Sequence, residues 1–132
     1  MSNEQSGGVV ATDTAPQAVG PYSQARWAGD LLFVSGQIGL APALGAMAGE
    51  KVEEQARQVM VNLGAILRAA GLGPEKIVKC TIFLTDMGDF EAVNKIYGAF
   101  FADCPSLPAR ACVAVAALPK GAKVEVEAIA QK

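Results

Sequence analysis

The chain has 132 residues, of which 52% are hydrophobic and 18% are charged; this length and composition suit one domain with a hydrophobic core and exclude a disordered protein. The net charge of −2 and the sequence pI of about 5.1, without any run of Lys or Arg, argue against nucleic-acid binding through a basic surface. The chain contains no histidine, which excludes Ser/His and Cys/His nucleophilic machinery and imidazole-ligated metal sites.

The N-terminal residues 1–14 are polar and lack the features of a signal or transit peptide, so they predict a flexible leader before a single domain over residues 15–132. Three cysteines without a Cys-x-x-Cys pair favour reduced thiols and a cytoplasmic location, with an organellar pool left open. The longest uncharged stretch, residues 31–49, contains a proline and several polar residues and glycines. It therefore predicts a strand followed by a loop, and we expect no partnership with a membrane.

The pattern of apolar residues predicts secondary structure in the order ββ-α-β-α-ββ. In chain order, we expect a strand up to Gly29-Asp30 and another over residues 31–37, a loop over 40–50, a helix over 52–70, a strand over 76–86, a helix over 90–102, and strands over 110–118 and 123–130. A turn at Pro119-Lys120-Gly121 indicates that the last two strands form a hairpin. This order is typical of an α/β sandwich with one mixed sheet.

Two of the predicted strands, residues 77–84 and 110–117, are apolar on both of their alternating faces. Two helices cover only one face of a sheet, and no further segment remains to cover the other. We therefore expect a homo-oligomer that buries the second face.

Arg110 stands in a run of small apolar residues, and it shares one strand face with Cys112. An unpaired buried guanidinium is costly, so Arg110 needs a partner. That partner is either an internal carboxylate in a structural salt bridge or the carboxylate of a substrate. We expect Cys112 to be a small buried apolar residue rather than a nucleophile, because no base accompanies it.

Glu125 and Glu127 alternate with valines and so share a face of the last strand. A solvated strand face explains this pair; the alternative is that one carboxyl has a raised pKa and acts as general acid or base on water. A hairpin centred near Lys120 would separate Arg110 from Glu125 by roughly 17 Å along the strand. The two residues then share a site only through another register or through a subunit interface.

Three further polar residues are candidates for ligand contacts. Tyr22 follows Gly20-Pro21, so it is either presented by a loop or packed in a turn. Ser35 ends a strand next to a glycine, which is either ordinary at a strand end or a place where a hydroxyl and backbone amides meet a polar ligand. Asn94 interrupts the second helix, where asparagine is mildly unfavourable, and this indicates a hydrogen-bonding task.

Five segments of the chain together resemble the RidA (YjgF) family of reactive-intermediate deaminases, and especially its eukaryotic members: GPYSQA, LLFVSGQIG, VEEQARQVMVNLGAILRAAG, DFEAVNKIYGAFF and PARACVAVAALPKGAKVEVEAIA. The resemblance runs from about Ala15 to Ala130. It implies a chorismate-mutase-like fold with one mixed sheet of about six strands, two helices on one face, and a homotrimer with sites at the subunit interfaces. It also implies hydrolysis of 2-imino acids and their 2-aminoacrylate-type enamine tautomers, released by pyridoxal-phosphate dehydratases, to 2-keto acids and ammonia.

The same resemblance implies roles for individual residues and no need for a metal or cofactor. Arg110 matches the family arginine that binds the substrate carboxylate, and Glu125 matches the acid that positions and activates water. Tyr22 matches the family's mobile loop tyrosine, and Ser35 matches a pocket hydroxyl. Asn94 and Cys112 match two further pocket positions. Two other functions stay open: an RNA-cleaving translation inhibitor, against which the acidic pI argues, and a non-catalytic carboxylate-binding or chaperone protein.

Overall fold

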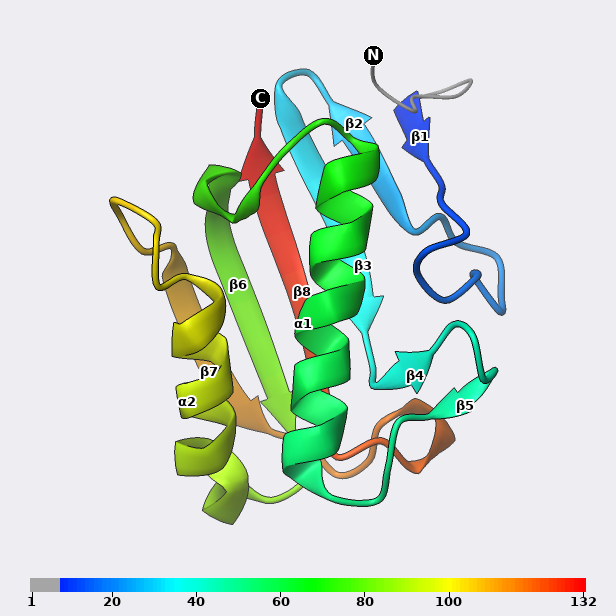
Figure 1. Ribbon diagram of the computed structural model, residues 1–132, viewed down its shortest axis with the longest axis vertical. Coiled ribbons are helices and arrows are strands. Elements are labelled where there is room, and N and C mark those ends of the chain that lie inside the picture. Colours follow the sequence, from blue (N-terminus) through cyan, green and yellow to red (C-terminus); the bar gives the residue numbers. More distant parts are fainter. Residues whose placement is uncertain (1–7) are drawn as a thin grey trace.

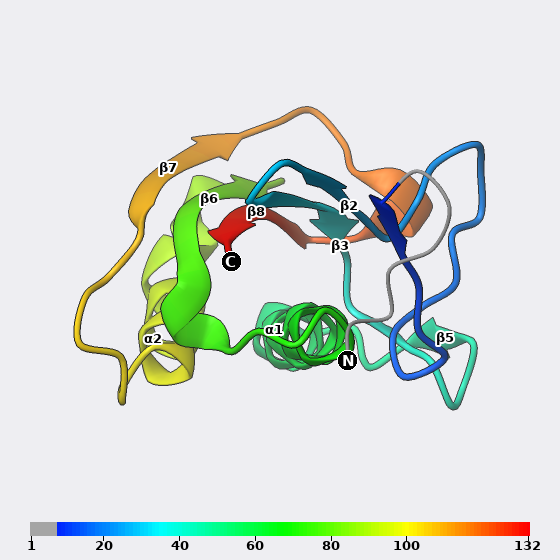
Figure 2. The ribbon, with the colours of Figure 1, turned by 90° about the horizontal axis from the view of Figure 1, so that it is seen from above.

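Two helices cover one face of a six-stranded mixed sheet, and no helix or strand among residues 8–132 covers the opposite face (Figures 1 and 2). The computed structural model describes residues 8–132. The sheet contains β1 (Val9–Val10), β2 (Ala25–Ala28), β3 (Leu31–Gln37), β6 (Ile77–Leu84), β7 (Ala109–Ala114) and β8 (Val124–Gln131), in the spatial order β1-β2-β3-β8-β6-β7. The helices are α1 (Val52–Ala69) and α2 (Phe90–Phe100). The predicted order ββ-α-β-α-ββ is confirmed, and the structure adds β1 and a small separate hairpin of β4 (Leu40–Ala41) and β5 (Ala46–Met47).

The predicted hairpin between the last two strands is wrong. β7 pairs with β6 in parallel, whereas β8 is inserted antiparallel between β3 and β6. After β7, residues 115–123 lead past the C-terminal end of β6 to the start of β8, and they contain the 3₁₀ turn Pro119–Gly121. Lys120 and Gly121 both have positive φ there, 56° and 68°. A turn signal in the sequence marks a change of direction, but it does not identify the strand that the returning segment joins.

The helix α1 forms where the sequence predicts it, because its apolar residues recur every three to four positions. At its start, the Glu54 carboxylate accepts a hydrogen bond from the Lys51 amide at 3.1 Å. At its end, Gly71 takes a φ of 79°, and its amide donates to the Arg68 carbonyl at 2.9 Å. The buried face of α1 packs on β3 and β8, with Leu63, Ile66 and Leu67 fully buried in the core.

Two buried amides of α1 connect the helix to the loops at one end of the sheet. Asn62 donates to the carbonyl oxygens of Ile38 and Leu40 at 3.2 and 2.9 Å. The Gln55 side-chain oxygen accepts from the Lys123 amide at 2.8 Å, and its nitrogen donates to a loop carbonyl. These bonds hold the β3–β4 connection and the start of β8 in place, close to the polar residues described below.

Part of the predicted flexible leader belongs to the fold. Val9 and Val10 pair with β2, and Val10 is fully buried. The buried side chain of Gln24 accepts from the Thr12 amide and donates to the Pro16 carbonyl, each at 2.7 Å. The leader prediction is therefore corrected for residues 8–14, while residues 1–7 lie outside the described part of the chain. Among residues 8–132, no helix is long and apolar enough to cross a membrane.

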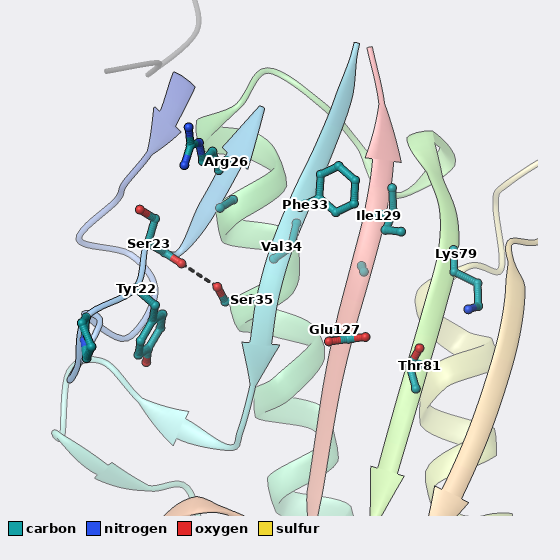
Figure 3. Close-up of a pocket in the computed structure, with 13 residues that line it drawn as sticks. Tyr22, Ser23, Arg26, Phe33, Val34, Ser35, Lys79, Thr81, Glu127 and Ile129 are labelled. Atoms are coloured by element: carbon teal, nitrogen blue, oxygen red, sulfur yellow. Dashed lines mark hydrogen bonds between the residues drawn. The ribbon is translucent and has the colours of Figure 1, made fainter. Parts of the chain in front are cut away.

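The uncovered face of the sheet carries large apolar side chains. Leu31 and Phe33 of β3 are 39% and 45% exposed, and Val113 of β7 is 43% exposed. In Figure 3 this face is seen directly, with Phe33 and Ile129 side by side and the helices behind the sheet. The sheet therefore has apolar side chains on both faces, as the sequence predicts, and the described part of the chain covers only one of the two faces.

Candidate functional site

The Arg110 side chain lies on the helix-covered face of β7, next to α2. Arg110 pairs with Cys80, which is fully buried under the helices, and paired residues of adjacent strands share a face. The guanidinium Nη1 donates to the Asn94 Oδ1 at 2.6 Å. Its central carbon is 5.0 Å from the centre of the Tyr97 ring and 5.6 Å from the centre of the Phe90 ring. Arg110 is exposed because β7 is an edge strand.

Within residues 8–132, no carboxylate pairs with Arg110, so the internal salt bridge that the sequence left open is not formed there. Every group that holds the guanidinium is neutral. Asn94 uses one of its five N–H donors, and the others make no hydrogen bond to the described part of the chain, so they are available to an anion from outside.

Cys112 lies two residues further along the same face and is half-buried against the core. Burial raises the pKa of its thiol, although the nearby Arg110 opposes this shift. A neutral, partly buried thiol is a poor nucleophile. Cys112 therefore contributes a neutral side chain beside Arg110 and does not act as a nucleophile.

Glu125 lies on the opposite, uncovered face of the sheet. It pairs with Phe83 of β6, and its neighbours along β8, Val124 and Val126, point into the core. Burial raises the pKa of the half-buried Glu125 carboxyl, and the negative charge of Glu127 on the same face raises it further. Of the two explanations that the sequence left open for this pair, this environment favours the one in which a carboxyl has a raised pKa.

A glycine in β3 makes room for the Glu125 carboxylate. The pairing of β3 with β8 shifts between Val34 and Gln37, so that Ser35 and Gly36 stand at an irregularity of the strand. A Cβ atom on Gly36 would collide with the carboxylate of Glu125. Only glycine at this position allows the carboxyl group to lie against the backbone of β3.

Tyr22 and Ser35 lie at the same end of the uncovered face. The Ser35 hydroxyl donates to the Ser23 carbonyl at 2.5 Å, drawn as the dashed line in Figure 3, and its oxygen remains available as an acceptor. Tyr22 is 49% exposed, in a loop beside this pair. Tyr22 and Ser35 border a hollow of about 640 Å³ along the sheet, and Tyr22 also lines a pocket of about 70 Å³ with Gly36 and Glu125.

The predicted site residues therefore form two groups. We call Asn94, Arg110 and Cys112 the arginine half-site. We call Tyr22, Ser35 and Glu125, together with Gly36, which the sequence did not predict, the glutamate half-site. Arg110 and Glu125 are separated by two strand spacings and three residue steps, roughly 14 Å in the plane of the sheet. Their side chains also point to opposite faces, so one chain does not bring both groups onto one small molecule.

Sequence reasoning missed several residues of these groups. Phe90 and Tyr97, whose rings lie beside the Arg110 guanidinium, and Gly36, which lies against Glu125, were not among the predicted site residues. The spacing of four and then three residues from Phe90 through Asn94 to Tyr97 places all three on one helix face, and this spacing was a usable signal. The fit of Gly36 against Glu125 depends on strand pairing and has no local signal. Within residues 8–132, no group of three or more His, Cys, Asp or Glu side chains could hold a metal ion.

The chain matches the family model described as Endoribonuclease L-PSP over residues 12–132. The RutC family protein y4sK of Sinorhizobium fredii is 55% identical over 120 residues, which cover 91% of this chain and 94% of that protein. A Mus musculus protein named 2-iminobutanoate/2-iminopropanoate deaminase is 50% identical over 122 residues, which cover 92% of this chain and 89% of that protein. The crystal structure of the YjgF gene product from E. coli has a TM-score of 0.89 and 46% identity, and the match covers 94% of this chain and 98% of that one.

Bacterial and mammalian relatives match at similar identity, so the resemblance is not particular to eukaryotic members. The matched region contains both half-sites and every strand of the large sheet except β1. This chain belongs to the Endoribonuclease L-PSP family, the family of YjgF and RidA.

Proposed function

We propose that the protein is a hydrolytic deaminase that converts small 2-imino acids and their enamine tautomers, released by pyridoxal-phosphate-dependent dehydratases, into 2-keto acids and ammonia. Similarity to the mouse 2-iminobutanoate/2-iminopropanoate deaminase supports the reaction. The observation that carries it in the structure is the Arg110 guanidinium, which is held by neutral groups and has no carboxylate partner within residues 8–132. A planar fork in this state suits the carboxylate of a small acid.

The proposal includes an active site shared between two copies of the chain. Arg110 lies at the rim on edge strand β7, whereas Glu125 lies on the face that carries exposed Leu31 and Phe33. Packing a neighbour against this apolar face would bury it and bring the neighbour's arginine half-site to the glutamate half-site. The family resemblance implied a closed homotrimer. In such a trimer every copy takes part in two complete sites, because it gives its arginine half-site to one neighbour and its glutamate half-site to the other.

In this site Arg110 binds the substrate carboxylate and fixes the position of the imine carbon. Glu125 takes a proton from a water molecule as the water oxygen bonds to the carbon of the protonated imine. The resulting carbinolamine receives that proton from Glu125 on its nitrogen. Its C–N bond then breaks as Glu125 takes the hydroxyl proton, which gives the 2-keto acid and ammonia, and the ammonia takes up this proton and leaves as ammonium. A carboxyl with a raised pKa suits these transfers, because its proton affinity is closer to that of the groups with which it exchanges protons.

The function is tested by a coupled assay with a threonine or serine dehydratase, in which semicarbazide traps the imine that escapes hydrolysis. We expect the wild-type protein to accelerate imine decay and to lower the yield of semicarbazone. A decay rate equal to that without the protein would contradict the proposal. Soaking crystals with 2-oxobutanoate supplies the structural readout, with the carboxylate expected on Arg110 at a subunit boundary.

The acid limb of the pH profile depends on Glu127. Since the Glu127 charge adds to the raised pKa of Glu125, the deprotonated base is lost at a higher pH than an ordinary glutamate would require. Replacing Glu127 with glutamine removes this repulsion, so we expect the acid limb of kcat/KM to move to lower pH. Glu91→Gln, an exposed acid on α2, is the control and should leave the limb in place. An unshifted limb in the Glu127 variant would exclude Glu125 as the titrating group.

The other readings have separate tests. Cleavage of RNA would require binding that weakens steeply with salt, and the net charge of −2 offers no general attraction to a phosphate backbone. A non-catalytic carboxylate-binding or chaperone protein would retain its activity after Glu125→Gln, whereas the deaminase would keep 2-oxobutanoate binding and lose turnover.

The cytoplasmic location stays part of the proposal, since Cys80, Cys104 and Cys112 are all free thiols.

A further inference from the structure

The guanidinium of Arg110 lies in a slot formed by one stripe of α2. Phe90, Asn94 and Tyr97 follow one another at spacings of four and three residues, so an aromatic ring, an amide and a second ring project from the same side of the helix. The Asn94 amide oxygen accepts one hydrogen bond from Arg110 at 2.6 Å. The centres of the Phe90 and Tyr97 rings lie 5.6 and 5.0 Å from the central carbon of the guanidinium. Both ring distances are within the range of cation–π attraction.

Of the two rings, that of Tyr97 is the better fixed. Tyr97 is 7% exposed, and its ring packs at 4.8 Å against the ring of Phe101, which is fully buried. Phe90 is only half-buried, at the first position of α2. A buried ring wedged against a second buried ring cannot turn away, so Tyr97 presents a constant surface to the guanidinium.

The hydroxyl group of Tyr97 does not explain why this residue is here. The hydroxyl oxygen is buried and makes no well-aligned hydrogen bond within residues 8–132, and its polar neighbour is the buried Cys80 thiol, a weak partner. Burial raises the pKa of Tyr97 well above its ordinary value, so the phenol stays neutral. The ring, rather than the hydroxyl, is the part that acts on Arg110.

We propose that Tyr97 is a positioning residue for carboxylate recognition: its ring holds the Arg110 guanidinium against α2 so that the unused N–H donors face outward to the substrate. This inference rests on the proposed function in taking Arg110 as the carboxylate ligand. An arginine on an edge strand otherwise has many side-chain rotamers. Asn94 restrains one nitrogen, and the Tyr97 ring restrains the plane of the fork.

Replacing Tyr97 with leucine tests the proposal through ligand binding and kinetics together. Because the carboxylate is bound in the ground state and in the transition state alike, we expect a KM about tenfold higher with kcat little changed, and a Kd for 2-oxobutanoate raised by a similar factor. Tyr97→Phe retains the ring, so its Kd and KM should stay within about twofold of the wild-type values. Tyr97→Met fills the same space without a ring and replaces the leucine variant if that protein does not fold.

Val93→Ala is the matched control, because Val93 is buried on the same helix and is not one of the three residues, Phe90, Asn94 and Tyr97, that hold the Arg110 guanidinium by a ring contact or a hydrogen bond. It should lower the melting temperature without changing Kd or KM. If Tyr97→Leu leaves Kd unchanged, or if Val93→Ala raises it equally, the positioning role is wrong. If Tyr97→Phe loses as much binding as Tyr97→Leu, the ring is not the acting group. Calorimetric binding of 2-oxobutanoate separates this inference from the proposed function, since it tests the slot even if the wild-type protein does not hydrolyse imines.

Discussion

Replacing Arg110 with alanine is expected to lower kcat/KM for imine hydrolysis about a thousandfold. A bidentate pair of charge-assisted hydrogen bonds contributes about 4 kcal/mol, and each 1.4 kcal/mol corresponds to a factor of ten. The two polar neighbours of Arg110 in the arginine half-site, the Asn94 amide and the Cys112 thiol, are neutral, so neither replaces the lost charge. The measurement is the dehydratase-coupled assay with semicarbazide trapping.

The fold should tolerate this change. Arg110 is exposed, and within residues 8–132 its only hydrogen bond is to the exposed Asn94. We therefore expect the melting temperature to stay within about 2 °C of the wild-type value. The control is Lys95→Ala, which removes the positive charge of an exposed residue on α2 and should leave kcat/KM unchanged. An Arg110→Ala protein as fast as the wild type would contradict the assigned role.

Arg110→Lys separates charge from geometry. Lysine keeps the positive charge but has no planar fork to stack on Tyr97 or to grip two oxygens, so its activity should lie between those of the wild-type and alanine proteins. Activity equal to that of the wild type would show that charge alone suffices and would remove the reason for the aromatic slot.

Mixing two inactive variants, Arg110→Ala and Glu125→Gln, should restore activity. In one chain the two residues lie on opposite faces of the sheet, so each proposed site takes Arg110 from one copy and Glu125 from another. In a randomly mixed 1:1 population of trimers, about a quarter of all sites contain both intact residues. Once the homotrimers are removed, about a third of the sites do, so the activity of the purified hetero-trimers should approach about a third of the wild-type value. Each variant alone should have at most about one-hundredth of that value, since it lacks a binding group or a general base at every site.

The mixture must be formed by co-expression with two affinity tags, so that only hetero-oligomers are assayed. The control is a mixture of Arg110→Ala with the double variant Arg110→Ala/Glu125→Gln, in which no site has an intact arginine. That mixture should remain inactive. If purified hetero-oligomers of the single variants also remain inactive, the shared site is wrong, whatever the oligomeric state.

The sequence predicted the local structure well, because local structure follows from the spacing of neighbouring residues. The amphipathic pattern predicted residues 52–70 as a helix, and α1 spans Val52–Ala69. The β-branched run at 76–86 became β6 at Ile77–Leu84. The strand alternation also showed correctly that Arg110 shares a face with Cys112 and that Glu125 shares a face with Glu127.

Only the tertiary structure decided which face each pair occupies. A strand with period-two alternation places its odd and even residues on opposite sides, but the helices that cover one side are brought there by distant parts of the chain. The insertion of β8 between β3 and β6 turned Glu125 to the uncovered face, and the pairing of β7 with β6 turned Arg110 toward α2. Residue identity thus determined the chemistry of Arg110 and Glu125, whereas long-range strand pairing determined that one chain keeps them apart.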